Sequence, residues 1–284
     1  RHKQNKDPYV KPGTPLVGTL LVSARGFGNV RLPDWKENVS VEPLDLNTGL
    51  HGDTVEIVLN AKTKKYSTAR VTKIISRGKV GFTGVLTQTD GVYQLKADDP
   101  RMYRTMIIPA NELNGAKVGE KVFCEITKWE DAKAEPFGKV AKVLGMPGQN
   151  NAEMTGIALE RGFSADFPRD VEMEANEWAE KGITADEIAG RKDMRGVPTC
   201  TIDPVDAKDF DDALSVKMLP DGNYEIGIHI ADVSHYVRPG TALDREALAR
   251  ATSVYLVDRT IPMLPEALSN DLCSLKPDVD RLAM

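Results

Sequence analysis

Five aspartates fall within ten residues of this 284-residue chain: Asp203, Asp206, Asp209, Asp211 and Asp212. Carboxylates packed this closely repel one another, and a like charge nearby raises the pKa of a carboxyl group. The single Lys208 among them provides too little counter-charge. Hard oxygen ligands suit magnesium, with manganese as the second choice, and both ions act at phosphate groups. The stretch therefore predicts a divalent-cation site.

Three other interpretations of the cluster fit the sequence less well. A solvated acidic loop is the common explanation for clustered aspartates, but apolar residues such as Ile202 and Phe210 are interleaved here as anchors. A calcium-binding EF-hand needs Gly at its sixth position and Glu at its twelfth, where this chain has Lys208 and Leu214. An Asp-x-Asp phosphatase would need a longer apolar strand directly before Asp209 than the sequence offers.

The run Thr-Ile-Asp, followed by Asp-Ala-Lys-Asp-Phe-Asp-Asp-Ala, resembles the catalytic signature of the ribonuclease II/ribonuclease R family of 3′→5′ exoribonucleases. The likeness continues, in the same order and spacing, through residues 228–234, 255–256, 261–265 and 268–275. It implies that four acidic positions are catalytic and hold the metal, with Asp206 outside the set: Asp203, Asp209, Asp211 and Asp212. It also implies that Tyr255 stacks on the last base at the 3′ end of the RNA. His229 and Asp232 are expected to be structural.

Charge is unevenly distributed. The net charge is −5, but residues 147–284 carry 14 Lys and Arg against 26 Asp and Glu, a net −12, so the first 146 residues carry +7. A mildly basic part before an acidic part suits a protein that gathers a polyanion with one and holds metal with the other. No apolar run approaches the ~20 residues that cross a membrane. Three scattered cysteines predict neither a disulfide framework nor a zinc site, and favour a cytoplasmic protein.

Short β-rich runs dominate the first half of the chain. After an arm at residues 1–13, strands within residues 14–76 predict a five-stranded barrel of the oligonucleotide-binding (OB) or cold-shock kind. The run Gly26-Phe27-Gly28 resembles the RNA-binding strand of cold-shock domains, so we expect Phe27 to stack on a base beside Arg25 and Arg31. Asn29 stands where those domains usually place a second aromatic residue. A Phe27 that packs inward is the alternative.

Similar runs recur in residues 77–146 and predict a second barrel, since both units close on alike segments, Ala-Arg-Val-Thr-Lys-Ile and Gly-Lys-Val-Ala-Lys-Val. Residues 147–198 are expected to be a helical connector, with a capping box at Thr184–Glu187. Residues 199–284 are expected to be the beginning of an α+β catalytic domain, in which a hairpin follows Asp212. The fold class is thus mainly β in the first half and α+β in the second, with the catalytic domain cut short at Met284.

The resemblance implies a processive, metal-dependent hydrolase that releases 5′-mononucleotides from single-stranded RNA. It also implies further active-site Arg and Glu residues that this sequence does not contain, so the 284-residue chain is expected to be inactive by itself. A monomer is expected. The alternative function is a non-catalytic RNA-binding module of two tandem cold-shock-like barrels. That module has no use for the aspartate cluster, which therefore separates the two hypotheses.

Overall fold

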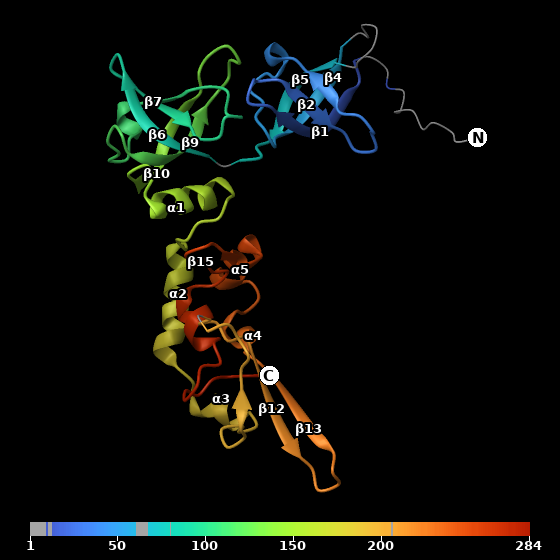
Figure 1. Cartoon of the computed structure of the whole chain (residues 1–284), viewed down its shortest axis with the longest axis vertical. Coiled ribbons are helices and arrows are strands. Elements are labelled where there is room, and N and C mark those ends of the chain that lie inside the picture. Colours follow the sequence, from blue (N-terminus) through green and yellow to red (C-terminus); the bar gives the residue numbers. More distant parts are fainter. Residues whose placement is uncertain (1–9, 11–12, 61–67, 80, 206) are drawn as a thin grey trace, which may run out of the picture. The chain divides into compact units, whose positions relative to one another are not determined.

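A computed structural model describes residue 10 and residues 13–60, 68–79, 81–205 and 207–284 (Figure 1). The expected arm, apart from Val10 and Gly13, and Asp206 lie outside the described residues. The chain divides into two compact units, unit 1 (Arg1–Gly162) and unit 2 (Phe163–Met284). No helix among the described residues is long and apolar enough to cross a membrane.

The first barrel begins unit 1 and is drawn in blue to cyan in Figure 1. Its five strands close in the order β1-β2-β3-β5-β4, with antiparallel neighbours except for the parallel pair β3 and β5. Alternate residues point inward, so Leu20, Val22 and Val30 lie in the core, while the residues next to them in the sequence point away from it. The elements are β1 (Pro15–Val22), β2 (Gly28–Arg31), β3 (Val39–Val41), the 3₁₀ turn η1 (Pro43–Asp45), β4 (Thr54–Leu59) and β5 (Thr68–Ser76).

The second barrel repeats the topology of the first. Its closed order β10-β8-β7-β6-β9 corresponds strand for strand to the first barrel. Equivalent positions 67 residues apart share unusual backbone geometry: Asn47 and Asn114 both have positive φ, and Gly52 and Gly119 both have φ of 93°. The predicted barrels are confirmed. The elements are β6 (Phe82–Thr89), β7 (Val92–Ala97), β8 (Met106–Ile108), the 3₁₀ turn η2 (Ala110–Glu112), β9 (Lys121–Lys128) and β10 (Phe137–Gly145).

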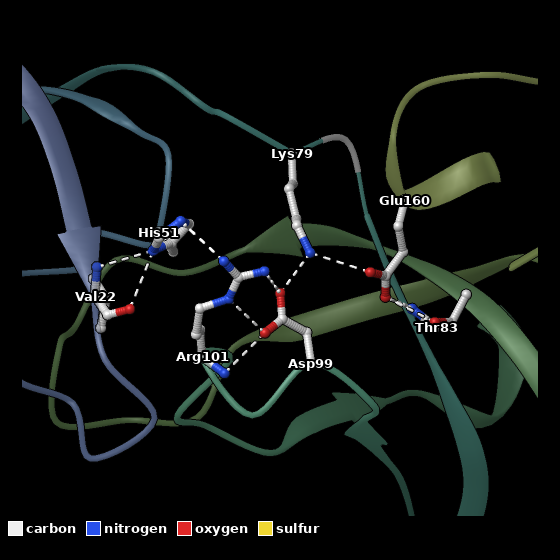
Figure 2. A network of polar contacts seen from close by, with 7 residues as sticks. All are labelled: Val22, His51, Lys79, Thr83, Asp99, Arg101 and Glu160. Atoms are coloured by element: carbon white, nitrogen blue, oxygen red, sulfur yellow. Dashed lines mark hydrogen bonds and ion pairs between the residues drawn. The ribbon is translucent and has the colours of Figure 1, made fainter. Parts of the chain in front are cut away.

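A polar network joins the two barrels of unit 1 (Figure 2). His51, from the first barrel, accepts a hydrogen bond at Nε2 from Arg101 of the second (3.0 Å), because a guanidinium group can only donate. Asp99 binds Arg101 and also Lys79 of the connecting segment, at 2.8 and 2.6 Å. Although burial raises the pKa of Asp99, the hydrogen bonds from these two cations hold it well below its usual value.

Apolar contacts reinforce this seam. Leu50 of the first barrel is buried in the core of the second. In return, Tyr103 of the second barrel packs against the core of the first and donates a hydrogen bond to the carbonyl of Gly49 (3.0 Å). The two barrels therefore form one unit rather than two modules on a string.

Helix α1 (Asn150–Glu160) also belongs to unit 1. Its last residue, Glu160, accepts hydrogen bonds from the backbone N–H (2.8 Å) and hydroxyl (2.7 Å) of Thr83 in β6, and lies 3.1 Å from Lys79. Its Glu153 forms an ion pair with Lys121 of β9. The stretch expected to be a connector, residues 147–198, is thus divided between the two units, with α1 in the first and the next two helices in the second.

Unit 2 packs helices beside a small antiparallel sheet of order β11-β12-β13. The predicted hairpin is present, and the predicted capping box opens α3. A core around Tyr236, Leu243, Leu268 and Leu272 holds the helices together. The elements are α2 (Arg169–Lys181), α3 (Ala185–Ala189), β11 (Thr199–Cys200), β12 (Asp212–Met218), β13 (Tyr224–Ile230), α4 (Val233–Tyr236), α5 (Ala242–Arg250), β14 (Val254–Tyr255), β15 (Thr260–Ile261) and the π-helical turn η3 (Leu268–Leu272).

Asp53 is the most deeply buried acid of the seam, at 1% exposure. It accepts hydrogen bonds from the N–H groups of Leu50 and Gly78 and an ion pair from Arg77 at 2.7 Å. Replacing Asp53 with Ala leaves these buried donors without an acceptor. We therefore expect the substitution to lower the free energy of unfolding by about 3 kcal/mol. Urea unfolding followed by circular dichroism measures the loss.

Glu120, the equivalent residue of the second barrel, is the matched control. It accepts the corresponding hydrogen bond from the N–H of Lys117, in an exposed setting. Glu120→Ala should therefore cost about 1 kcal/mol or less. Equal losses in the two variants would show that the seam adds nothing to the role of Asp53.

Candidate active site

The aspartate cluster lies in the loop between β11 and β12 of unit 2. Asp212 is the first residue of β12, and the loop before it turns at Pro204, whose carbonyl accepts a hydrogen bond from the N–H of Ala207 (3.0 Å). The sequence-based expectation of acids in a loop that enters a strand is met. The turn is what allows carboxylates that would otherwise alternate along an extended chain to approach one another.

Contacts from two distant segments fix the backbone of this loop. Ala231, just after β13, donates to the carbonyl of Asp211 (2.9 Å), and Leu275 donates to the carbonyl of Phe210 (2.9 Å). Ser274 contacts the loop through its hydroxyl, which donates to the carbonyl of Lys208 (2.7 Å) and accepts from the N–H of Phe210 (3.0 Å). The loop is therefore held through the backbone of three residues, Lys208, Phe210 and Asp211.

Asp211 is the electrostatic centre of the cluster. Burial raises the pKa of its carboxyl group, and the nearby carboxylates of Asp209, Asp212 and Asp203 raise it further. The structure thus brings Asp203, Asp209 and Asp212 close enough to Asp211 to raise its pKa. Their roles as catalytic residues and metal ligands remain predictions.

The chemistry of this donor set fits a hard divalent cation. A positive charge placed among these carboxylates would favour the ionised form of Asp211, which its neighbours oppose. Among the described residues, however, no group of three or more His, Cys, Asp or Glu side chains is already arranged to hold a metal ion. The donors fit the cation by type, and their side chains would have to turn toward it.

Tyr255 lies beside the acids at the end of β14. Its hydroxyl donates to Oδ2 of Asp209 (3.1 Å), while the residue as a whole is 68% exposed. Burial of the hydroxyl, the hydrogen bond with Asp209 and the charges of Asp209 and Asp211 raise the pKa of Tyr255. The ring is therefore accessible to a base, as its predicted stacking role requires, and the hydroxyl also orients an acid, which the sequence did not indicate.

The residues predicted to bind RNA on the first barrel all lie at its surface. Phe27 is 49% exposed at the entry to β2, so the alternative in which it packs inward does not hold. Arg25 and Arg31 are exposed too, and Phe27, Asn29 and Arg31 alternate with buried residues on one face of β2. The placement agrees with a stacking surface, and RNA binding by these residues remains a prediction.

His229 and Asp232 have structural contacts, as expected. The Nε2 of His229 lies 2.8 Å from the hydroxyl of Ser215, on the face of the hairpin opposite to Asp212. Asp232 caps α4 and forms an ion pair with Arg191. Sequence reasoning missed Ser274, because a lone serine in an apolar segment carries no physical signal of what its hydroxyl will meet.

The raised pKa of Asp211 predicts the direction of a stability change. A carboxyl group that binds its proton more readily in the folded state than in the unfolded chain opposes folding once it is ionised. We therefore expect Asp211→Asn to raise the melting temperature at pH 7 in a chelating buffer. The advantage should shrink as the pH falls through the raised value toward the ordinary one of 3.8.

Asp221 provides the control, because hydrogen bonds from Asn223 lower its pKa. Asp221→Asn should not raise the melting temperature at pH 7. Differential scanning calorimetry of both variants between pH 4 and pH 7 compares them. A lower melting temperature for Asp211→Asn at pH 7 would contradict the electrostatic account of the cluster.

Two family models match the chain. The RNB domain matches residues 191–284, within unit 2, and the Cold shock domain matches residues 95–168. Ribonuclease R of Thermotoga maritima is 37% identical over 99% of this chain and 40% of that protein. Ribonuclease R of Escherichia coli is 36% identical over 95% of this chain and 33% of that protein. The chain therefore spans two fifths or less of the length of these relatives.

Solved structures agree with the sequence matches. The structure described as Mycoplasma genitalium RNase R in complex with ribose-methylated single-stranded RNA matches with a TM-score of 0.81 and 30% identity, over 94% of this chain and 43% of that one. Yeast Ssd1, described as a pseudonuclease, matches with a TM-score of 0.64 at 18% identity over 94% of this chain and 40% of that one, which shows the fold alone. By its sequence matches, its paired barrels and its aspartate loop, the chain belongs to the ribonuclease II/ribonuclease R family.

Proposed function

We propose that the protein acts as a processive 3′→5′ exoribonuclease that hydrolyses single-stranded RNA and releases 5′-mononucleotides. The observation that carries the proposal is the gathering of Asp203, Asp209 and Asp212 around Asp211, in a loop whose backbone is held at Lys208, Phe210 and Asp211. A pseudonuclease shares this fold, so the fold by itself does not carry hydrolysis. The acids and the relatives named Ribonuclease R do.

The carboxylates are assigned to hold magnesium, with manganese as a substitute. Such a cation, when bound, polarises a phosphate oxygen and lowers the pKa of a water molecule. The residues of the chain would supply the rest: Asp209 and Asp211 would help to hold the ion at the scissile phosphate, and Tyr255 would stack on the last base. The alternative, a non-catalytic module of two barrels, gives the aspartate cluster no role and is not favoured.

The barrels are assigned to guide the strand. Phe27 offers a ring for stacking, and Arg25 and Arg31 offer charges for phosphates on the same part of the first barrel. A cytoplasmic, monomeric protein is the simplest setting for this activity. Incubating the full-length protein with single-stranded RNA labelled at its 5′ end tests the function. Shortening from the 3′ end with magnesium, and none with a chelator, is expected.

Asp211→Asn should abolish hydrolysis by the full-length protein while leaving RNA affinity nearly unchanged. Asn keeps the shape of the side chain but loses the charge that holds a cation. The loss of turnover should exceed the ~10–100-fold typical of residues that only support a ligand. Turnover and RNA affinity are measured in parallel, with Asp221→Asn as the control at an exposed acid. Retained turnover in Asp211→Asn would reject its assigned role.

Phe27→Leu and Arg31→Ala should weaken RNA binding in different ways. Loss of the aromatic ring removes stacking, worth about 1–3 kcal/mol per base, at every salt concentration. Loss of Arg31 should instead reduce the slope of log affinity against log salt by about 0.7, because one fewer phosphate is neutralised. Titrations of single-stranded RNA at several salt concentrations separate the two effects. Unchanged affinity in both variants would remove the first barrel from the binding surface.

A further inference from the structure

We propose that the hydroxyl group of Ser274 is a positioning group for Asp209, holding the aspartate loop in the conformation that its chemistry requires. This deepens the proposed function, on which it rests for what Asp209 does once it is held. Ser274 is fully buried, and its contacts with the loop come from 64 and 66 residues away in the sequence.

The geometry places one oxygen atom on both sides of Asp209. The hydroxyl of Ser274 donates to the carbonyl of the residue before it, Lys208 (2.7 Å), and accepts from the N–H of the residue after it, Phe210 (3.0 Å). The two peptide groups that flank Asp209 are therefore held by a single atom. Because those peptide groups set the direction of the Cα–Cβ bond, they aim the carboxylate.

Few side chains could make this pair of contacts. A hydroxyl group is both donor and acceptor on one short arm, whereas Ala has neither function and a thiol is weak in both. The carboxylate end is held separately, by the hydroxyl of Tyr255 at 3.1 Å. Asp209 is thus the acid whose backbone and side chain are both oriented by other residues.

Ser274 can act as a fixed point because it is itself tied to the core. Its N–H donates to the carbonyl of Asp271 (2.9 Å), and Arg281 donates from Nε to the carbonyls of Asp271 (2.9 Å) and Ser274 (3.2 Å). The preceding residues Leu272 and Cys273 are buried in the core of unit 2. The core thus fixes η3 and the residues after it, including Ser274, and Ser274 in turn fixes the loop.

The neighbouring Ser269 provides a matched control. It lies in η3, which ends two residues before Ser274, but its hydroxyl donates only to the local carbonyls of Leu264 and Pro265, both at 3.3 Å. Ser269→Ala therefore removes a hydroxyl group from the adjoining turn without touching the aspartate loop. A general loosening of this segment would affect both variants alike, whereas of the two serines only Ser274 contacts the residues that flank Asp209.

Two measurements on the 284-residue chain test the proposal. Hydrogen–deuterium exchange followed by mass spectrometry reports on peptides covering residues 207–212, which should exchange faster in Ser274→Ala than in the unsubstituted chain or Ser269→Ala. Binding of Mn²⁺ alone, followed by electron paramagnetic resonance, should weaken by about 10–100-fold in Ser274→Ala, as for other residues that orient metal ligands. Ser274→Thr, which keeps a hydroxyl group, should restore both properties.

Exchange in residues 207–212 that is unchanged in Ser274→Ala, or equally accelerated in Ser269→Ala, would overturn the proposal. If Ser274→Ala fails to fold, Ser274→Cys keeps the shape with a weaker hydrogen-bonding group and takes its place. An unsubstituted chain that binds no Mn²⁺ would instead count against the proposed metal-dependent function, while the exchange measurement still decides whether Ser274 positions the loop.

Discussion

Repulsion among the carboxylates of the aspartate loop is the constraint that shapes unit 2. A loop that carries such charges will spread apart unless other parts of the chain hold its backbone. Ala231, Ser274 and Leu275 do so here, and Tyr255 holds the side chain of Asp209. These residues lie within the very segments whose order and spacing resemble the nuclease family. Residues within the family pattern therefore hold the aspartate loop in place.

Unit 1 shows how a duplicated fold acquires a fixed geometry. The two barrels share topology and turn conformations, yet the loop that carries Leu50 and His51 docks on the second barrel. At the equivalent positions the second barrel has Lys117 and Val118, and Val118 is 54% exposed. The same loop thus became an interface in one copy and stayed a surface in the other. The consequence is that the two barrels are docked on each other as one unit.

Local patterns made most of the fold predictable. Alternation of apolar residues gave the long strands and the hairpin, and the Thr184–Glu187 capping box gave the start of α3. The three-residue strand Val39–Val41 is too short to show a period of its own. Non-local contacts were beyond reach: nothing in the sequence shows that Tyr103 enters the seam or that Ser274 meets Phe210. The clustered charge identified the aspartates of the site from the sequence alone. The residues that hold them in place could not be identified in this way.

The surroundings of Asp209 and Asp211 in the loop have opposite effects. Asp209 receives a hydrogen bond from Tyr255 and lies between two peptide groups held by Ser274, so its orientation is over-determined. For Asp211, burial and the neighbouring carboxylates oppose ionisation of the side chain. If stability alone mattered, an uncharged residue at position 211 would remove the cost of ionising this acid. The retention of a carboxyl group there supports the proposal that the loop holds a cation.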